Sequence, residues 1–490
     1  MTNTEFLERV NHLIELSPKD QQQIMKALEF GANAHTGQTR ASGENYFTGH
    51  CMPVAIHVAE LGLSANMIIA ALLHDTIEDT SITHKDIRKE FNKTVADLVE
   101  GVSKLGKLKY RGNERHVESL RKFFVAATKD VRVIILKLCD RWHNLETLEY
   151  LPEEKRKRIA LESMMIHGAL ASRLNMGKLT NAINDLAFPY AMPEEYEKTL
   201  SLRESFLKQE DKVIEQMYRD MLRVLTDSLG YTPKIDRRKK GIYSFYKKLE
   251  RKEWNTDQIH DMIAIRAIVK TDADCYKALG AVHAKWRPVQ GRVKDYIASP
   301  KPNGYQSLHT SVFTGRGNVL EVQIRTEDMH QFAEFGIAAH HTYKADTKSA
   351  RKNEFDWIDQ LGDIKQDESV DDYLKDLRTD FFADRIFAMT PRGDVIDLPR
   401  GATVLDFAFA VHTDLGMSAQ GGKINGVYKA LKTPLESEDI VEIVPGKKTH
   451  PTTDWLNWSI TNLAHSRVRK KLGLQRKFVP NKKAKTSSAK

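Results

Sequence analysis

A cluster of ionisable residues directly behind an apolar run restricts the fold of this chain more than any other feature. The residues Met67–Leu73 are all apolar, as expected of a buried helix, and the segment Leu73–Thr80 (LHDTIEDT) follows at once. Burying His74, Asp75 and two further carboxylates at a helix end is unfavourable unless they are paired or bind a cation. A lone His-Asp doublet more often marks a solvated helix end, so this cluster alone leaves both interpretations open.

A second cluster of the same kind favours the metal site. The apolar run Val131–Leu136 is followed by KLCDRWHNLET, whose polar residues recur at three- and four-residue spacing on one helix face. Two such helices resemble two walls of one site. His50, at the entrance of an apolar helix over 54–63, offers a third ligand position or else a hydrogen-bonded structural histidine. A mixed set of nitrogen and oxygen ligands suits Mn²⁺, Fe²⁺ or Zn²⁺: His50, His74, Asp75 and Asp140.

Composition indicates an ordinary globular protein with several domains. The 490 residues are 41% hydrophobic and 29% charged, and no apolar run reaches the roughly 18–20 residues that span a bilayer. The start, MTNTEFLERV, does not have the basic and apolar regions of a secretion signal. Three scattered cysteines argue against disulfides and CxxC zinc modules. We therefore expect a cytoplasmic protein with no membrane partner.

Hydrophobic periodicity divides the chain into segments of different texture. Helical spacing dominates residues 1–195, whereas alternating, β-branched runs and Gly/Pro-punctuated loops follow. Two strands, a helix that starts at a capping-box pattern, and further strands then suggest a small β-grasp-like module. The predicted fold is multidomain, and its parts are an all-α domain over 1–195, an α/β domain over 196–345, a linker helix over 346–380, the β-grasp module over 381–447 and a basic tail over 448–490.

The middle segment combines cations and aromatic rings. Arg237–Lys240 precedes Tyr243, and a second basic stretch leads into Lys301–Thr310. Phosphates are bound by Lys and Arg, and a purine can stack on Tyr or on a guanidinium. Asp261 and Glu321 each lie on a predicted strand beside apolar neighbours, where paired carboxylates can hold Mg²⁺. Each charge taken singly is a common surface group, but together they indicate phosphoryl or nucleotidyl transfer.

The basicity of the chain is concentrated at its end. From Arg467 to Lys490 there are ten Lys/Arg and no acidic residue, while the whole chain has a net charge of +9, so the rest is nearly neutral. A solubilising terminus and an RNA-docking segment are equally compatible with this tail.

These motifs, in this order, resemble the long RelA/SpoT homologues, the enzymes that make and destroy (p)ppGpp. AHTGQTR, LLHDTIEDT and KLCDRWHNLET resemble the family's HD-type hydrolase domain. RRKKGIYSFYKK, HDMIAIR, RVKDYIASPKPNGYQSLHT and EVQIRTEDMHQFAEFGIAAHHTYK resemble its nucleotidyltransferase-like synthetase domain. FAMTPRGDVIDLP through SEDIVEIV resembles its TGS domain. The family's cysteine-rich and ACT domains have no counterpart in this sequence.

For hydrolysis, the resemblance implies a Mn²⁺ ion bound by His50, His74, Asp75 and Asp140. Glu78 and Asp79 are then expected to position or deprotonate the attacking water. The groups expected to hold (p)ppGpp are Arg40, Lys137, Asn144 and Thr147. This chain has one residue more between Tyr46 and His50 than the family's usual spacing.

For synthesis, the resemblance implies Mg²⁺ held by the catalytic carboxylates Asp261 and Glu321, with Glu321 also placed to assist deprotonation of the guanosine 3′-hydroxyl. Arg238 is expected to stack on the adenine of ATP, and Tyr305 on the guanine of GDP or GTP. The remaining expected substrate contacts are Lys240, Ser244, Lys248, Lys294, Lys301, Asn303 and His309. A histidine of the third module, His412, matches one associated with the tRNA acceptor end.

The first functional interpretation is therefore a bifunctional (p)ppGpp synthetase and hydrolase. Because running both reactions at once wastes ATP, occupancy of one site should disfavour the other, with the helices over 162–200 coupling them. The alternatives are a hydrolase with residual synthesis, and a tRNA- or ribosome-binding regulator with little catalysis.

Overall fold

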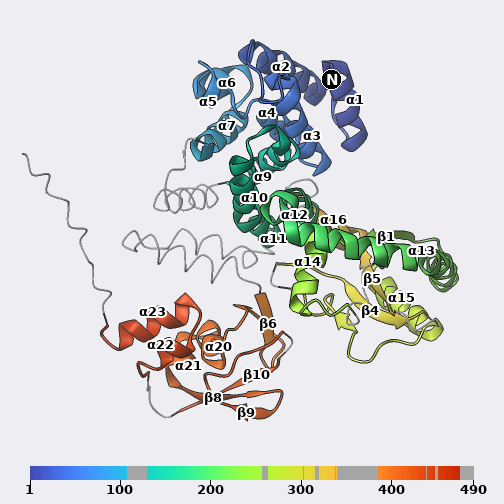
Figure 1. Cartoon of the computed structure of the whole chain (residues 1–490), viewed down its shortest axis with the longest axis vertical. Coiled ribbons are helices and arrows are strands. Elements are labelled where there is room, and N and C mark those ends of the chain that lie inside the picture. Colours follow the sequence, from blue (N-terminus) through green and yellow to red (C-terminus); the bar gives the residue numbers. More distant parts are fainter. Residues whose placement is uncertain are drawn as a thin grey trace, which may run out of the picture. The chain divides into compact units, whose positions relative to one another are not determined.

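The computed structural model describes residues 1–106, 130–256, 263–301, 303–314, 319–336, 338, 385–437, 439–446 and 451–474. The chain divides into two compact units, Met1–Asp371 and Asp372–Lys490 (Figure 1). The linker helix expected over 346–380 lies outside the described residues.

Helices and turns make up the described part of residues 1–229, apart from an isolated bridge between Thr39 and Asn45. The helices are α1 (Asn3–Leu13), α2 (Pro18–Ala34), the π-helix η1 (Phe47–Cys51), α3 (Met52–Glu60), α4 (Ala65–Leu72), α5 (Thr76–Asp79), α6 (His84–Glu90), α7 (Lys93–Gly106), α9 (Val131–Glu146), the 3-10 helix η2 (Leu148–Tyr150), α10 (Glu153–Glu162), the π-helix η3 (Ser163–Gly168), α11 (Ala169–Arg173), α12 (Gly177–Ala191) and α13 (Pro193–Leu229).

The centre of this helical part is formed by three apolar helices. Residues 67–72 of α4 are buried, as are most residues of α3 and α9. α3 packs against α4 and α9, and α4 packs against α2 and α7. Because polar clusters follow or interrupt these buried stretches, this packing brings the clusters together inside the helical part.

The entry to α3 differs from the sequence-based expectation. The Gly, Ser and Asn residues of the segment 34–53 predict a loop, but residues Phe47–Cys51 form a π-helical turn in which Met52 N–H bonds to the Phe47 carbonyl. A π-turn accommodates one extra residue in a helix. In this turn the His50 side chain is buried.

The second half of the first unit is a five-stranded sheet with the order β1-β2-β5-β4-β3, in which β2 and β5 are parallel and the other neighbours antiparallel. The strands are β1 (Lys234–Lys239), β2 (Ile263–Val269), β3 (Lys294–Asp295), β4 (Leu308–Phe313) and β5 (Val319–Thr326). The helices around it are α14 (Ile242–Arg251), α15 (Asp272–Lys285) and α16 (Glu327–Phe335). α13 begins at Pro193, packs against α15 and β1, and runs across the boundary expected at 195/196.

The two faces of this sheet differ in chemistry because side chains alternate along each strand. On β5, Leu320, Val322 and Ile324 belong to the hydrophobic core that α13 and α15 cover. The intervening residues of β5 are Glu321, Gln323 and Arg325. Their register partners on β2 and β4 include Arg266 and His309, so one face of the sheet is polar and charged.

The described residues of the second unit form a hairpin, a three-stranded sheet of order β10-β8-β9 and four short helices. The elements are β6 (Arg385–Met389), β7 (Val395–Pro399), α20 (Val404–Val411), α21 (Thr413–Ser418), β8 (Ala419–Ile424), β9 (Val427–Lys429), β10 (Val441–Pro445), α22 (Trp455–Trp458) and α23 (Asn462–Lys471). The capping box at Thr403 occurs where the sequence predicts it. So does the turn at Asn425-Gly426, whose two residues both have a positive φ.

The segment after the β-grasp module is part of the same core. Trp455, Ala464 and Val468 of α22 and α23 are buried against α20. The buried carboxylate of Asp406 accepts hydrogen bonds from the backbone N–H groups of Thr403, Ile460 and Thr461 and from two threonine hydroxyls. Residues 451–474 of the expected basic tail are therefore packed helices, while 475–490 lie outside the described residues.

Candidate active sites

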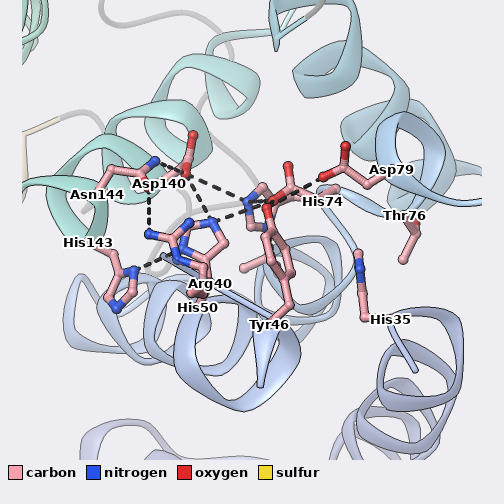
Figure 2. A network of polar contacts seen from close by, with 12 residues as sticks. His35, Arg40, Tyr46, His50, His74, Thr76, Asp79, Asp140, His143 and Asn144 are labelled. Carbon is pink, nitrogen blue, oxygen red and sulfur yellow. Dashed lines mark hydrogen bonds and ion pairs between the residues drawn. The ribbon is translucent and has the colours of Figure 1, made fainter. Parts of the chain in front are cut away.

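Four predicted metal ligands converge in the helical part. His50 comes from η1, His74 and Asp75 from the junction of α4 and α5, and Asp140 from α9. His50 Nε2 lies 3.4 Å from Asp75 Oδ2 and 3.3 Å from Asp140 Oδ1, and His74 Nε2 lies 3.1 Å from Asp75 Oδ2 and 3.7 Å from Asp140 Oδ1. Figure 2 shows His50, His74 and Asp140 pointing toward one another. Their ligand atoms lie within 4.8 Å, close enough to share one ion.

The residues present fit a divalent cation. The His74 ring donates from Nδ1 to the Ala71 carbonyl at 2.7 Å, which leaves Nε2 fully buried and without a hydrogen bond among the described residues. Burial opposes protonation of His74, but Asp75 and Asp140 outweigh it and raise its pKa to about 10. The cluster therefore concentrates negative charge around an unused imidazole nitrogen, which is the environment of a metal site.

Two further side chains orient these ligands. His50 Nδ1 lies 2.8 Å from His143 Nδ1. If His50 offers Nε2 to a metal, its proton sits on Nδ1 and His143 accepts it. Burial and the neighbouring His50 and Arg40 lower the pKa of His143 to about 3, so it stays neutral. The Tyr46 hydroxyl donates to Asp75 Oδ2 at 2.7 Å and lies 3.5 Å from Asp79 Oδ2.

The expected substrate groups form one wall beside this cluster. Arg40 donates to Asn144 Oδ1 and to Thr147 Oγ1, both at 3.0 Å. Asn144 and Lys137 in turn donate to Asp140 at 2.6 and 2.7 Å. Burial opposes ionisation of Asp140, but Lys137 and the two imidazoles hold its pKa well below the ordinary value.

Glu78 and Asp79 lie on the short helix α5 that follows His74 and Asp75. Glu78 is half-buried and Asp79 is exposed. Burial and the charge of Asp75 raise the pKa of Asp79. A carboxylate with a raised pKa is a better proton acceptor, so Asp79 is suited to that task at this site.

A second constellation occupies the polar face of the sheet and is centred on Glu321. His309 Nδ1 lies 2.9 Å and Gln323 Nε2 lies 3.1 Å from Glu321 Oε1. The Tyr305 hydroxyl lies 2.9 Å from His309 Nε2, and Arg238 donates to Gln323 Oε1 at 3.3 Å. Burial would raise the pKa of Glu321, but His309, Gln323 and Lys240 together lower it to about 2.

The expected phosphate contacts are arranged around this centre. Ser244 and Lys248 lie one turn apart on α14, and burial and Lys240 lower the pKa of Lys248 to about 7. Burial also lowers the pKa of Lys240. The Lys301 ammonium lies 5.0 Å from the centre of the Tyr305 ring, and Lys294 pairs with His309 across β3 and β4. Asp261 lies outside the described residues.

Several contacts of these sites are not singled out by the sequence patterns. Gln323 connects Glu321 to Arg238, and Arg266 and Arg325 share Glu334 Oε1 at 3.0 and 3.2 Å on the same sheet face. The sequence feature that could have identified these residues is the alternation of polar and apolar residues along β2 and β5, which places them on the same face of the sheet as Glu321. For His143 the signal was its three-residue spacing from Asp140 on α9.

In the second unit, the His412 side chain is 67% exposed and accepts a hydrogen bond from Asp414 N–H at 3.2 Å.

Both groups of candidate metal ligands found among the described residues lie in the helical part of the first unit. Within the ranges that the structure describes, every helix is too short or too polar to cross a bilayer.

Comparison with known proteins identifies all three parts. Residues 237–348 match the model of the region found in RelA / SpoT proteins, residues 27–177 match the HD domain and residues 386–445 match the TGS domain. An HD domain implies a divalent metal, and the cluster of His50, His74 and Asp140 offers a place for one.

Similar proteins cover nearly the whole chain. It is 40% identical over 473 residues to the guanosine-3′,5′-bis(diphosphate) 3′-pyrophosphohydrolase of Aquifex aeolicus (strain VF5), with 96% of this chain and 67% of that protein covered. It is 40% identical over 474 residues to the bifunctional (p)ppGpp synthase/hydrolase SpoT of Escherichia coli (strain K12), covering 95% and 67%. It is 42% identical over 453 residues to the GTP pyrophosphokinase of Myxococcus xanthus, covering 91% and 60%. The chain thus spans 60–67% of the length of these relatives. With matching domains and relatives of this similarity, it belongs to the RelA/SpoT family.

Proposed function

We propose that this chain both synthesises and hydrolyses (p)ppGpp. The supporting observation is that one compact unit contains two separate constellations, the metal-ligand cluster around His74 and the sheet face around Glu321. Each has its own expected substrate groups, and an enzyme with one activity would need only one of them. Because the proposed substrates are ATP, GDP or GTP, and (p)ppGpp, we place the activity in the cytoplasm.

In hydrolysis, the metal would be Mn²⁺, held by His50, His74, Asp75 and Asp140. When bound, it would polarise the 3′-pyrophosphate and lower the pKa of water. Asp79 would take the proton of the attacking water, and Glu78 would help to position that water. The wall beside the metal would bind the substrate through charge and hydrogen bonding, and its members are Arg40, Lys137, Asn144 and Thr147.

In synthesis, the 3′-oxygen of GDP or GTP attacks the β-phosphorus of ATP, and the bond to the α–β bridging oxygen breaks to release AMP. Mg²⁺ would be held by Asp261 and Glu321 and would offset the charge of the triphosphate. Arg238 and Tyr305 would stack on adenine and guanine. The remaining contacts to phosphates and acceptor would come from Lys240, Ser244, Lys248, Lys294, Lys301, Asn303 and His309.

Electrostatics separates the two roles that the resemblance gives to Glu321. A carboxylate whose pKa is lowered to about 2 is a weak base at neutral pH but a good ligand for a hard cation. We therefore assign Glu321 to Mg²⁺ binding and to orienting His309, rather than to the main proton transfer.

The second unit would bind RNA rather than catalyse a reaction. The exposed His412 and the basic residues Arg467, Arg469, Lys470 and Lys471 of the α23 region support contact with a tRNA end or with ribosomal RNA.

Product analysis by thin-layer chromatography tests the proposed function. The chain would be incubated with ATP, GDP and Mg²⁺, and separately with ppGpp and Mn²⁺, each with an EDTA control. New ppGpp in the first incubation and GDP plus pyrophosphate in the second would support two activities. Hydrolysis alone would leave the sheet face as a vestigial site. If no product formed in either incubation, the enzymatic function would be rejected.

A further inference from the structure

The turn between α11 and α12 belongs to the helical part, and its Asn175 side chain forms hydrogen bonds to two segments of the sheet domain. Asn175 Nδ2 donates to the Phe332 carbonyl on α16 at 3.1 Å. Its Oδ1 accepts from Asn303 Nδ2 at 3.3 Å. Asn175 is only 7% exposed, so both hydrogen bonds are shielded from water.

The backbone holds this side chain in place. Asn175 has a φ of +55°, a conformation that asparagine tolerates better than most residues and that glycine adopts freely. Two glycines mark close contacts between this turn and α16. A Cβ added to Gly177, at the start of α12, would lie 2.6 Å from the Ala333 carbonyl oxygen. A Cβ added to Gly336, directly after α16, would overlap the Leu174 carbonyl oxygen. The backbones of the turn and of α16 are therefore in direct contact.

Asn303 transmits this contact to the Glu321 constellation. Its Oδ1 accepts from Tyr305 N–H at 3.3 Å, so its Nδ2 must find an acceptor elsewhere, and Asn175 Oδ1 provides it. The Tyr305 hydroxyl forms a hydrogen bond with His309 Nε2, and His309 Nδ1 forms one with Glu321 Oε1. A continuous series of hydrogen bonds thus joins Asn175 to the proposed Mg²⁺ ligand.

We propose that Asn175 is a positioning residue for the acceptor nucleotide of the synthetase. By fixing the orientation of the Asn303 amide, it holds the Asn303–Tyr305 loop in the conformation that accepts the guanine base. The inference rests on the proposed function, because Tyr305 and Asn303 are acceptor contacts only if the sheet face is the synthetase site. It adds a residue from outside the sheet domain to that site.

Two substitutions at this position separate the hydrogen bonds from the backbone. Asn175→Gly keeps the left-handed conformation available and removes both side-chain bonds. Asn175→Asp keeps an oxygen that accepts from Asn303 but replaces the donor to Phe332 by a charged acceptor oxygen that faces the Phe332 carbonyl. Asn425→Gly is the matched control, because Asn425 also has a positive φ, of 52°, but lies exposed in the second unit.

The experiment measures the affinity for mant-GDP by fluorescence titration and the KM for GDP and for ATP with the full chain. Asn175→Gly should weaken mant-GDP binding and raise the KM for GDP by about threefold to tenfold, as expected for one or two lost hydrogen bonds. The KM for ATP and kcat should change by less than about twofold. Asn175→Asp should bind mant-GDP more tightly than Asn175→Gly, because it retains the acceptor for Asn303, and Asn425→Gly should match the unmodified chain.

Unchanged GDP affinity in Asn175→Gly would overturn the inference, as would an equal loss for GDP and ATP or an Asn175→Asp variant as weak as Asn175→Gly. Each of these results leaves the proposed function intact if the unmodified chain binds mant-GDP. An unmodified chain that binds no mant-GDP would reject the acceptor site itself and the role of Asn175 with it.

Discussion

Tyr46 connects a proposed metal ligand, Asp75, to the proposed proton acceptor, Asp79. Its hydroxyl donates to Asp75 and lies near Asp79, while its ring stacks on His35 with centroids 5.1 Å apart. Removing the hydroxyl leaves the ring contacts and frees the Asp75 carboxylate to rotate. Outer contacts of this kind usually change metal affinity by about tenfold to 100-fold.

We predict that Tyr46→Phe weakens Mn²⁺ binding by about tenfold, measured by isothermal titration calorimetry on the metal-free chain. Tyr428→Phe is a suitable control, because that tyrosine is 57% exposed in the second unit. Wild-type Mn²⁺ affinity in Tyr46→Phe would show that the hydroxyl does not orient Asp75.

We predict that Lys248 makes nucleotide binding at the proposed synthetase site depend on pH. Burial and Lys240 lower its pKa to about 7 in the absence of nucleotide. The ammonium form, which binds phosphate, is therefore dominant at pH 6 and minor at pH 8. ATP affinity should fall by roughly tenfold over that interval, because binding must then also protonate the lysine.

A guanidinium stays charged over this whole range. We therefore predict that Lys248→Arg flattens the pH profile of the ATP dissociation constant, measured with a fluorescent ATP analogue. The same slope in Lys248→Arg as in the unmodified chain would assign the pH dependence to another group.

The sequence predicted those site residues whose role is visible from their immediate neighbours in the chain. His74, Asp75 and Asp140 each follow a buried apolar run, so their unusual chemistry is visible in the sequence, and the structure brings them together. The contacts of Tyr46 with Asp75, of Gln323 with Arg238 and of Asn175 with Phe332 span 29, 85 and 157 residues. Such contacts exist only after the helices and strands have packed, so the spacing of residues within one helix or strand does not predict them.

At the scale of elements, Asp406 joins α20 to the segment that leads into α23. Its capping box was visible in the sequence, but its bonds to Ile460 and Thr461 were not, because they span more than fifty residues. The basic composition of α23 also concealed two buried positions, Ala464 and Val468, in a short helix of low hydrophobicity. Short elements whose apolar residues are few are the ones that pattern arguments miss.

Replacing this carboxylate should loosen α22 and α23. In Asp406→Asn one acceptor oxygen becomes a donor that faces N–H and O–H groups, so we predict a loss of about 2–3 kcal/mol of local stability. Hydrogen exchange measured by mass spectrometry should show faster exchange in peptides covering 451–474. Asp414→Asn, whose carboxylate is 91% exposed, is the control. Unchanged exchange in Asp406→Asn would contradict the structural role of this residue.

At the scale of the whole molecule, the helices between the two constellations offer a route for coupling. α12 packs against α9, which carries Asp140, and against α16, which follows Glu321 on the chain. Asn175, in the turn before α12, accepts a hydrogen bond from Asn303 of the sheet domain. The coupling expected over residues 162–200 therefore has a continuous path of packed elements.

We predict that a saturating non-reactive GDP–ATP analogue pair weakens ppGpp binding by the hydrolase about fivefold or more. Calorimetric titration of ppGpp with Asp79→Asn, in which the proposed proton acceptor is removed, would measure this without turnover. The reverse titration must give the same factor, because coupling between binding sites is reciprocal. Equal ppGpp affinity with and without the analogues would reject coupling while leaving both activities possible.

The most direct test of two independent active sites in one chain is product analysis with Asp75→Asn and Glu321→Gln beside the unmodified protein. Both substitutions preserve side-chain size and remove one negative charge. We predict that Asp75→Asn loses hydrolysis by about 100-fold or more and keeps synthesis, and that Glu321→Gln does the opposite. If either substitution abolished both reactions, or neither reaction, the assignment of one activity to each constellation would be wrong.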